Sequence, residues 1–344
     1  MNQNNIHIDN KLGIIHNFRI FKQEGDIVKH IALALAIATT SAVASVPKDL
    51  AYPTAALTTA DQVIDQVYYV NHFYPFTNYG IGREGKNTIT TFILRPKGKK
   101  PLTMTLERYL NNDYSDGVYN AKDFAVFRSG KLKNLAFLIT DYVDPAKTQQ
   151  FEIFIPSIRK IRRFAQPARD DAWGGADFTF GDVALRKPHH ETHELLPNEK
   201  YSGCIPSMDL PKNERNKYTK KQNITPDCSI DGTDLYVVKS TAKDANWWYD
   251  YRISYVDTKR FVDYKTTYFK NGEHIKTINR SWHSAGLDDP RGNYWAYWYG
   301  KTLTTGHESM AFVPKAATRV NKDYKKKIWT TKLLKKIPKK FKFK

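Results

Sequence analysis

The chain has 344 residues, of which 41% are hydrophobic and 13% aromatic, and its formal net charge is +19. This apolar fraction excludes a disordered chain, and the length is sufficient for one or two domains with a large core. The charge favours anionic partners, which could be nucleic acid, lipid head groups or an acidic protein.

The first 44 residues have the pattern of a secretory signal peptide. Lys29 and His30 precede an apolar run over residues 31–38, and a small-residue stretch ends in Ala42-Val43-Ala44. A basic region, a short apolar region and an A-x-A site mark export, whereas a membrane span needs a longer run. We therefore expect residues 1–44 to be a signal peptide with a long n-region, and the mature protein to be periplasmic. No cysteine follows the site, so we expect no lipid anchor there.

The mature chain is predicted to begin with one helix over residues 59–72. Thr59 and Gln62 have the spacing of a capping box, and Val63, Ile64, Val67 and Val70 follow at helical spacing. The chain then changes to short apolar segments that predict strands. These segments are residues 88–94, 102–110, 124–127, 135–142, 149–155, 235–240, 249–256, 262–269, 274–281, 294–301 and 309–313.

Successive strands with tight turns predict a mainly β (α+β) fold built on a curved antiparallel sheet of roughly nine or more strands. Asn271-Gly272 lies between two of the predicted strands. This dipeptide is a strong signal for a two-residue hairpin.

The segment from Phe151 to Leu185 is the most informative part of the chain. Phe151, Ile153 and Ile155 alternate along a predicted strand that ends at Pro156, and the basic run Arg159-Lys160-Ile161-Arg162-Arg163 follows. Gly174-Gly175 then leads into the box Asp177-Phe178-Thr179-Phe180-Gly181-Asp182, which we expect to form a short helix or turn.

This segment resembles the signature of the LolA-like outer-membrane lipoprotein-sorting superfamily, in the branch with an uncharacterised spirochaete-protein domain. Ala176 stands where that pattern usually has Ser, and Trp173 stands where a Phe-Met pair is common. The resemblance covers roughly residues 60–282. It implies an incomplete, half-open β-barrel with helices plugging its concave face. It also implies a carrier of lipid or lipoprotein acyl chains, without a cofactor, that serves outer-membrane sorting or works beside an exporter of the resistance-nodulation-division (RND) type.

The acidic residues of the box have a structural interpretation. Asp177 and Asp182 can pair with Arg159, Arg162 or Arg163 and thereby hold the turn at Gly175 against the sheet edge. The alternative is a secreted hydrolase that uses Asp170, Asp171, Asp177 and Asp182, or the cluster from His189 to His193. The zincin spacing H-E-x-x-H and the G-x-S-x-G elbow are both absent from the sequence, so we predict no catalytic residues and no metal site.

Large aromatic residues are candidates for the wall of an apolar cavity, the alternative being ordinary core packing. The candidates are Trp173, Phe178, Phe180, Trp247 and Trp248.

The two cysteines, Cys204 and Cys228, lie in a polar connection or insertion over residues 187–231. An even count in an oxidising compartment favours a disulfide over two free thiols. Closing this loop should contribute roughly 3 kcal/mol on the chain-entropy model.

Residues 321–344 form a Lys-rich tail that follows the domain of residues 45–320. The tail has 11 Lys and one Asp, so it supplies +10 of the +19 charge. Trp329, Leu333, Leu334 and Ile337 recur at helical spacing, which predicts an amphipathic helix on an anionic membrane surface. The alternative is a solvated end. The predicted membrane contacts are Lys326, Lys327, Trp329, Leu333, Lys335 and Lys336.

Export disfavours nucleic acid as the partner. Without the tail the net charge falls to +9, and the sequence has no identifiable nucleic-acid motif.

Overall fold

A computed structural model describes residues 45–336 except 221, 223–224 and 326–327, and these belong to the unit formed by residues 43–344. The signal peptide expected over residues 1–44 lies outside the described residues. So do Lys326, Lys327 and Ile337 of the predicted amphipathic helix.

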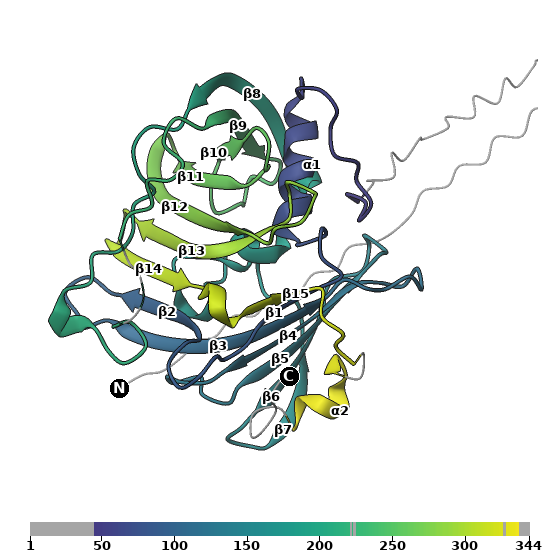
Figure 1. The fold of residues 1–344 in the computed structure, drawn as a ribbon, viewed down its shortest axis with the longest axis vertical. Coiled ribbons are helices and arrows are strands. Elements are labelled where there is room, and N and C mark those ends of the chain that lie inside the picture. Colours follow the sequence, from purple (N-terminus) through teal and green to yellow (C-terminus); the bar gives the residue numbers. More distant parts are fainter. Residues whose placement is uncertain (1–44, 221, 223–224, 326–327, 337–344) are drawn as a thin grey trace, which may run out of the picture. The chain divides into compact units, whose positions relative to one another are not determined.

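One antiparallel sheet of fifteen strands makes up the described part of the chain (Figure 1). The main path of the sheet runs β7-β6-β5-β4-β3-β2-β14-β13-β12-β11-β10-β9-β8, and its two ends do not pair. The predicted mainly β fold with a curved, half-open antiparallel sheet is thereby confirmed. In chain order the strands are β1 (Asn78–Ile81), β2 (Thr90–Arg95), β3 (Leu102–Asn111), β4 (Tyr119–Phe127), β5 (Ala136–Tyr142), β6 (Gln150–Ile155), β7 (Lys160–Phe164), β8 (Glu191–Lys200), β9 (Asp234–Ala242), β10 (Tyr251–Asp257), β11 (Asp263–Lys270), β12 (Glu273–Ser284), β13 (Asn293–Thr302), β14 (His307–Phe312) and β15 (Thr318–Val320).

Two neighbouring rows in the middle of the sheet each consist of two strands. In the first row β2 pairs with one half of β3 and β1 pairs with the other half. In the next row β14 pairs with β2, and β15 pairs with β1. The last two strands of the domain, β14 and β15, therefore pair with β2 and β1, which ties the last part of the domain to its start.

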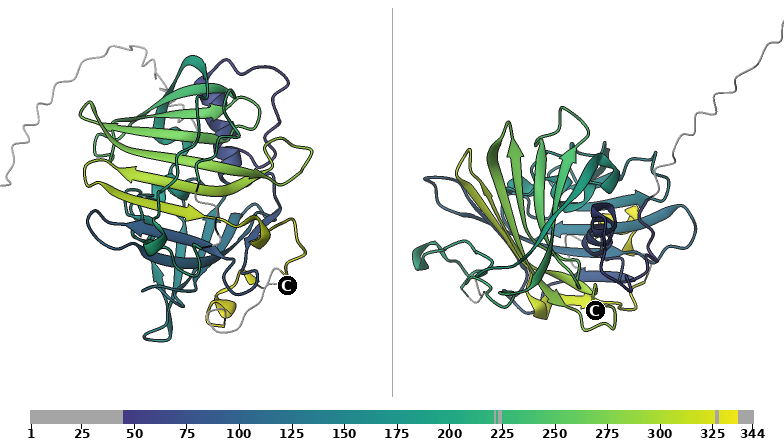
Figure 2. Two further views of the ribbon diagram at one scale, coloured as in Figure 1. Left: turned by 60° about the vertical axis from the view of Figure 1, so that its left-hand side comes forward. Right: turned by 90° about the horizontal axis from the view of Figure 1, so that it is seen from above.

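The helix α1 (Ala60–Asn71) covers the concave face of the sheet near β8 and β9 (Figure 2). Thr59 and Gln62 form the expected capping box. Val63 and Val70 are fully buried, because the apolar stripe of the helix faces the sheet. The box after Gly174-Gly175 leads into the single-turn π-helix η2 (Gly181–Leu185) on the same face, which contains the last two residues of the box, Gly181 and Asp182.

The hairpin between β11 and β12 turns at Asn271-Gly272, as expected. Asn271 has φ +51° and Gly272 has φ +78°, which is the left-handed pair that a type I′ turn requires.

Two strands that the sequence did not suggest form the edges of the sheet. β7 contains most of the basic run after Pro156, and β8 falls in the connection expected over residues 187–231. Both are polar because an edge strand faces solvent, and charged side chains there discourage pairing with other chains. A search for apolar alternation therefore passes over them.

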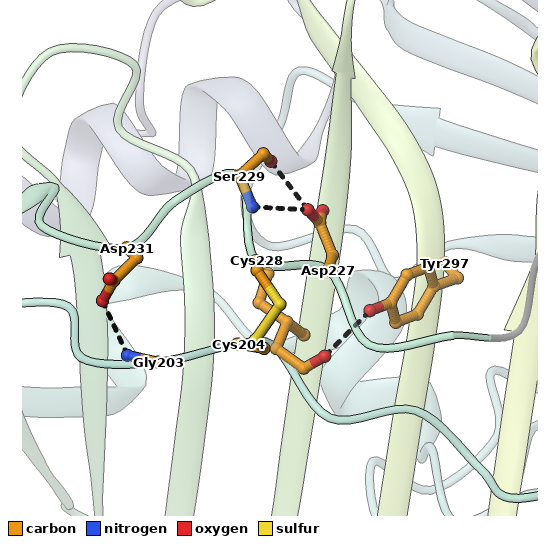
Figure 3. The surroundings of a disulfide bond; sticks show 8 residues. Gly203, Cys204, Asp227, Cys228, Ser229, Asp231 and Tyr297 are labelled. Atoms are coloured by element: carbon orange, nitrogen blue, oxygen red, sulfur yellow. Dashed lines mark hydrogen bonds between the residues drawn. A yellow bond between two sulfur atoms is a disulfide. The ribbon is translucent and has the colours of Figure 1, made fainter.

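The insertion between β8 and β9 crosses the convex face of the sheet (Figure 2). Cys204 and Cys228 are joined by a disulfide at its base (Figure 3). Tyr297 on β13 donates a hydrogen bond to the carbonyl of Ile205 at 3.1 Å. Ser281 on β12 donates one to Asp227 at 2.5 Å. The insertion thus serves as a lid over this face rather than as a free loop.

The tail covers the neighbouring part of the convex face, beside β5 and β6 (Figure 1). Trp329 is 2% exposed, and its indole N–H donates to the carbonyl of Tyr109 at 2.8 Å. Trp329 and Leu334 pack in one cluster with side chains of β3, β4, β5 and β6. The predicted membrane contact of Trp329 is therefore wrong, because the sheet already buries its ring. Within the tail's described residues the only α-helix is α2 (Thr331–Leu334), one turn long.

We expect Trp329→Ala to lower the free energy of unfolding by about 3–5 kcal/mol, since a buried ring and its hydrogen bond are lost together. The measurement is urea denaturation of the mature protein. Lys336→Ala, at an exposed position of the same segment, is the control and should leave the midpoint unchanged. Equal midpoints for the two variants would show that the tail does not stabilise the sheet.

Candidate functional site

An apolar cavity lies in the concave face between η2 and the strands of the central sheet. Its wall contains Phe92, Trp295 and Trp298 from the strands, together with Phe178 and Leu185 beside or within η2. The cavity has a volume of about 80 Å³. This is space for roughly five to eight water-sized atoms, so a short acyl segment fits in it.

One ion pair interrupts this apolar wall. Arg108 on β3 donates from Nε to Asp123 on β4 at 2.8 Å. Its guanidinium lies 5.2 Å from the ring centre of Trp295. The Asp123 Oδ1 atom is buried without a hydrogen-bond partner among the described residues. The cavity wall therefore contains one charged pair within a mainly apolar surface.

A second, polar pocket lies on the other side of η2, next to α1. We call it the basic chamber, and its charged lining consists of Asp182, Glu191 and Asp263 with Arg186, Lys187, Arg252 and Arg280. Val183 and Ala184 of η2 line both the chamber and the apolar cavity. One turn of helix thus separates an apolar site from a charged one.

Asp182 anchors η2 to the sheet. Its carboxylate accepts hydrogen bonds from Lys276 on β12 at 2.7 Å and from Tyr268 on β11 at 2.6 Å. Arg186 lies 3.3 Å away on the same side. Burial would raise the pKa of Asp182, but Lys276 and Arg186 outweigh burial and hold the pKa well below its usual value.

Glu191 forms the second buried pair at the start of β8. Arg252 binds it with two hydrogen bonds, of 2.9 Å and 2.7 Å, and Tyr249 donates a third at 2.7 Å. Burial opposes ionisation, yet Arg252 and Arg186 lower the pKa of Glu191 to about 2. Asp263 makes a third pair with Arg280 at 2.5 Å.

The predicted aromatic residues divide into two groups. Trp173, Phe178 and Phe180 line the apolar cavity, as proposed from the sequence. Trp247 and Trp248 do not line it; they stack on each other at 4.6 Å between ring centres. Trp248 also packs closely against η2 at Gly181. A Cβ atom at that position would lie 2.4 Å from the Trp248 ring, so only glycine fits there.

The expected pairing of the box with the basic run is wrong. Asp177 binds Thr302, His307 and Ser309, and the partners of Asp182 are those given above. The run instead forms the exposed edge strand β7, where Arg163 approaches Glu152 at 3.5 Å. Arg159 and Arg162 also lie on this exposed edge, on the far side of the sheet path from β12. The residue Gly175 has φ +81°, so the glycine is required by the turn itself.

The hydrolase alternative gains no support from the geometry. Of its four aspartates, only Asp182 lines either of the two pockets. Its carboxylate already forms ion pairs with Lys276 and Arg186. Asp177 sits between Ser309 and His307, so His307 cannot take a proton directly from that serine.

The histidine cluster is similarly occupied. His193 bonds to Ser240 and to the carbonyl of Pro188. Within the described ranges no group of three potential metal ligands occurs.

The described residues also contain no helix with the length and hydropathy of a membrane span.

The sequence interpretation missed the charged residues of the concave face. Arg252 lies inside β10, and Lys276 and Arg280 both lie inside β12. A cation in the middle of a predicted strand was the available signal, because such a residue is buried only with a partner.

Comparison with known proteins supports the architecture. A family model described as an uncharacterized protein matches residues 120–224, and no curated protein matches the sequence. A solved domain from Vibrio parahaemolyticus, described as an outer-membrane lipoprotein-sorting protein domain, has a similar fold. It aligns with a TM-score of 0.57 at 13% identity, covering 80% of this chain and 98% of that one.

A second solved structure agrees. A DUF1329 family protein from Desulfovibrio piger aligns with a TM-score of 0.58 at 12% identity and covers 81% of this chain and 100% of that one. At these identities the likeness concerns the fold alone.

The low pKa of Glu191 makes its contribution to stability depend on pH. Its folded pKa is about 2, below the ordinary value of 4.5. The contribution is therefore complete above about pH 4.5 and is lost as the pH falls towards 2. We expect the stability difference between the wild type and Glu191→Gln to shrink by about 3 kcal/mol between pH 6 and pH 2. Urea titrations at several pH values measure it.

The control for this experiment is Glu199→Gln, an exposed position of the same strand. Its difference from the wild type should stay near zero at every pH. A pH-independent difference for Glu191→Gln would mean that the Glu191 carboxylate gains nothing from Arg252 in the folded state.

Proposed function

We propose that the protein is an exported periplasmic carrier that binds the acyl chain of a lipid or lipoprotein non-covalently in the apolar cavity. The observation that carries this proposal is the aromatic cavity under η2. A concave apolar site with few polar groups is typical of ligand binding. The lipoprotein-sorting description of a domain with the same fold supports it.

A carrier is favoured over an enzyme by the chemistry of the cavity wall. The polar side chains in it are Thr90, Arg108, Asp123 and Gln149, and Arg108 and Asp123 are engaged with each other. No nucleophile with a free base faces the cavity among the described residues. Export through the predicted signal peptide would bring such a carrier to the compartment of its cargo. An RND-type exporter as its partner is proposed from the family resemblance.

We propose in addition that the tail contacts an anionic membrane through its lysines, and that Trp329 and Leu334, which are buried against the sheet, take no part in the contact. Lys332, Lys335 and Lys336 are exposed, and Lys160 and Arg163 of β7 share a shallow groove with two of them. Such a basic surface would be attracted to anionic lipids within the screening length of about 10 Å.

Filling the cavity should abolish ligand binding while the sheet stays folded. Ala125 lies in the cavity wall, so Ala125→Trp would occupy the space of a short acyl segment. We expect mass spectrometry to find lipid on the wild type purified from the periplasm, and at least tenfold less on the variant. Ala146→Trp, at an exposed turn position, is the matched control. Equal amounts of lipid on all three proteins would show that the cavity is not the lipid-binding site.

Neutralising the tail should weaken membrane contact. We expect the triple variant Lys332→Gln, Lys335→Gln and Lys336→Gln to bind phosphatidylglycerol vesicles up to about 100-fold more weakly at low salt, since each lysine contributes about 1 kcal/mol. Vesicle sedimentation measures this.

The triple variant Lys212→Gln, Lys217→Gln and Lys220→Gln removes the same charge from exposed positions of the insertion and is the control. If both triple variants lose binding equally, net charge rather than the tail governs attraction to the membrane.

A further inference from the structure

The basic chamber contains more positive than negative charge. Its lining presents four cations and three carboxylates, and Lys276 adds a fifth cation behind Asp182. This leaves an excess of two positive charges. His72, which follows α1 and lines the chamber, and the nearby His193 do not alter that excess at neutral pH, because burial lowers the pKa of both rings.

Two of the cations have donors to spare. The guanidinium of Arg280 binds Asp263 and Thr266 through Nη1, while its Nε is buried without a hydrogen-bond partner. The whole residue is only 1% exposed. Lys187 is half-buried and forms no ion pair within the described part of the chain. For the buried Arg280 an unused donor is costly unless an anion completes it, whereas Lys187 is partly exposed.

The spare donors lie close to the apolar cavity. Arg280 lies 4.1 Å from the ring centre of Trp298, and Trp298 is part of the cavity wall. The chamber has a volume of about 50 Å³, which is space for roughly three to five water-sized atoms. A phosphate group has this size, and guanidinium and ammonium groups are its usual partners.

We propose that the basic chamber binds the phosphate head group of an anionic amphiphile whose tail enters the apolar cavity. The inference rests on the proposed carrier function and narrows the cargo to acidic amphiphiles. Arg280 Nε and Lys187 Nζ donate to the phosphate oxygens, and the ligand's negative charge offsets the excess of the chamber. The tail passes beside η2, at Val183 and Ala184, which line both sites.

The test compares two ligands that share a tail and differ in the phosphate. The mature protein is loaded with the neutral dye 1-N-phenylnaphthylamine, and the dye is displaced by octyl phosphate or by 1-octanol. We expect octyl phosphate to displace it at a concentration at least 20-fold lower. Lys187→Gln should reduce this preference about five- to tenfold. Lys212→Gln, with the same charge change at an exposed position, should retain it.

A second variant guards against a loss of folding. Arg280→Gln combined with Asp263→Asn removes both charges of one buried pair together, and far-UV circular dichroism reports whether the sheet is intact. We expect the folded double variant to bind the dye and to lose most of the preference for octyl phosphate.

The outcomes separate this inference from the carrier function. If the dye binds but both ligands displace it equally, the head-group site is overturned while the carrier stands. If neither the dye nor either ligand binds, the carrier proposal fails as well. Inorganic phosphate at constant ionic strength should compete weakly, because it has no tail. Competition as strong as that of octyl phosphate would assign the chamber to free phosphate and overturn the head-group proposal.

Discussion

An antiparallel sheet that does not close leaves two broad faces and two edges to be protected from water and from other chains. Here each face is covered by different parts of the chain. On the concave side α1 and η2 supply apolar side chains, and on the convex side the disulfide-joined insertion and the C-terminal segment do so. The edges β7 and β8 are rich in charged residues, which opposes edge-to-edge pairing. The apolar cavity exists because the short helix η2 covers this part of the concave face without filling the space beneath it with side chains.

The buried ion pairs explain why η2 stays in place. A single π-turn has little stability of its own, since few backbone hydrogen bonds are made within it. Asp182 fastens it to β11 and β12, and Trp248 packs so closely on Gly181 that no side chain fits there. Replacing one partner would leave an uncompensated charge, a loss of about 3–5 kcal/mol. The ion pairs therefore specify the position of η2 and, with it, the shape of the cavity.

Much of the fold could be predicted from the sequence, because apolar alternation and turn residues are local signals. The helix at Thr59, the hairpin at Asn271-Gly272 and the central strands were all predicted near their observed positions. The edge strands were not, because their side chains face solvent and carry no apolar alternation.

The site was predictable only in part. The aromatic residues of the box could be assigned to a cavity wall because large apolar residues near a sheet are usually buried. The partners of Asp177 and Asp182 on other strands could not be found, since they come from β11, β12, β13 and β14, about 90 to 130 positions further along the chain. The arginines of the basic run are nearer in sequence, but β7 lies at one edge of the sheet, away from these strands. Trp329 was misassigned for a related reason: an apolar stripe fits a sheet face as well as a membrane.

The two sides of η2 differ in how they can respond to a ligand. On the chamber side, the contacts are ion pairs with fixed geometry, and displacing them would expose charges in a poorly solvated place. On the cavity side, the contacts are between aromatic rings, such as Phe180 with Phe151 at 6.1 Å and Trp173 with Phe92 at 5.0 Å. Such contacts can slide at a cost of about 1 kcal/mol each. An acyl chain longer than the present cavity would therefore be accommodated by movement of β6 and its neighbours at the open edge, while η2 and β12 keep their positions.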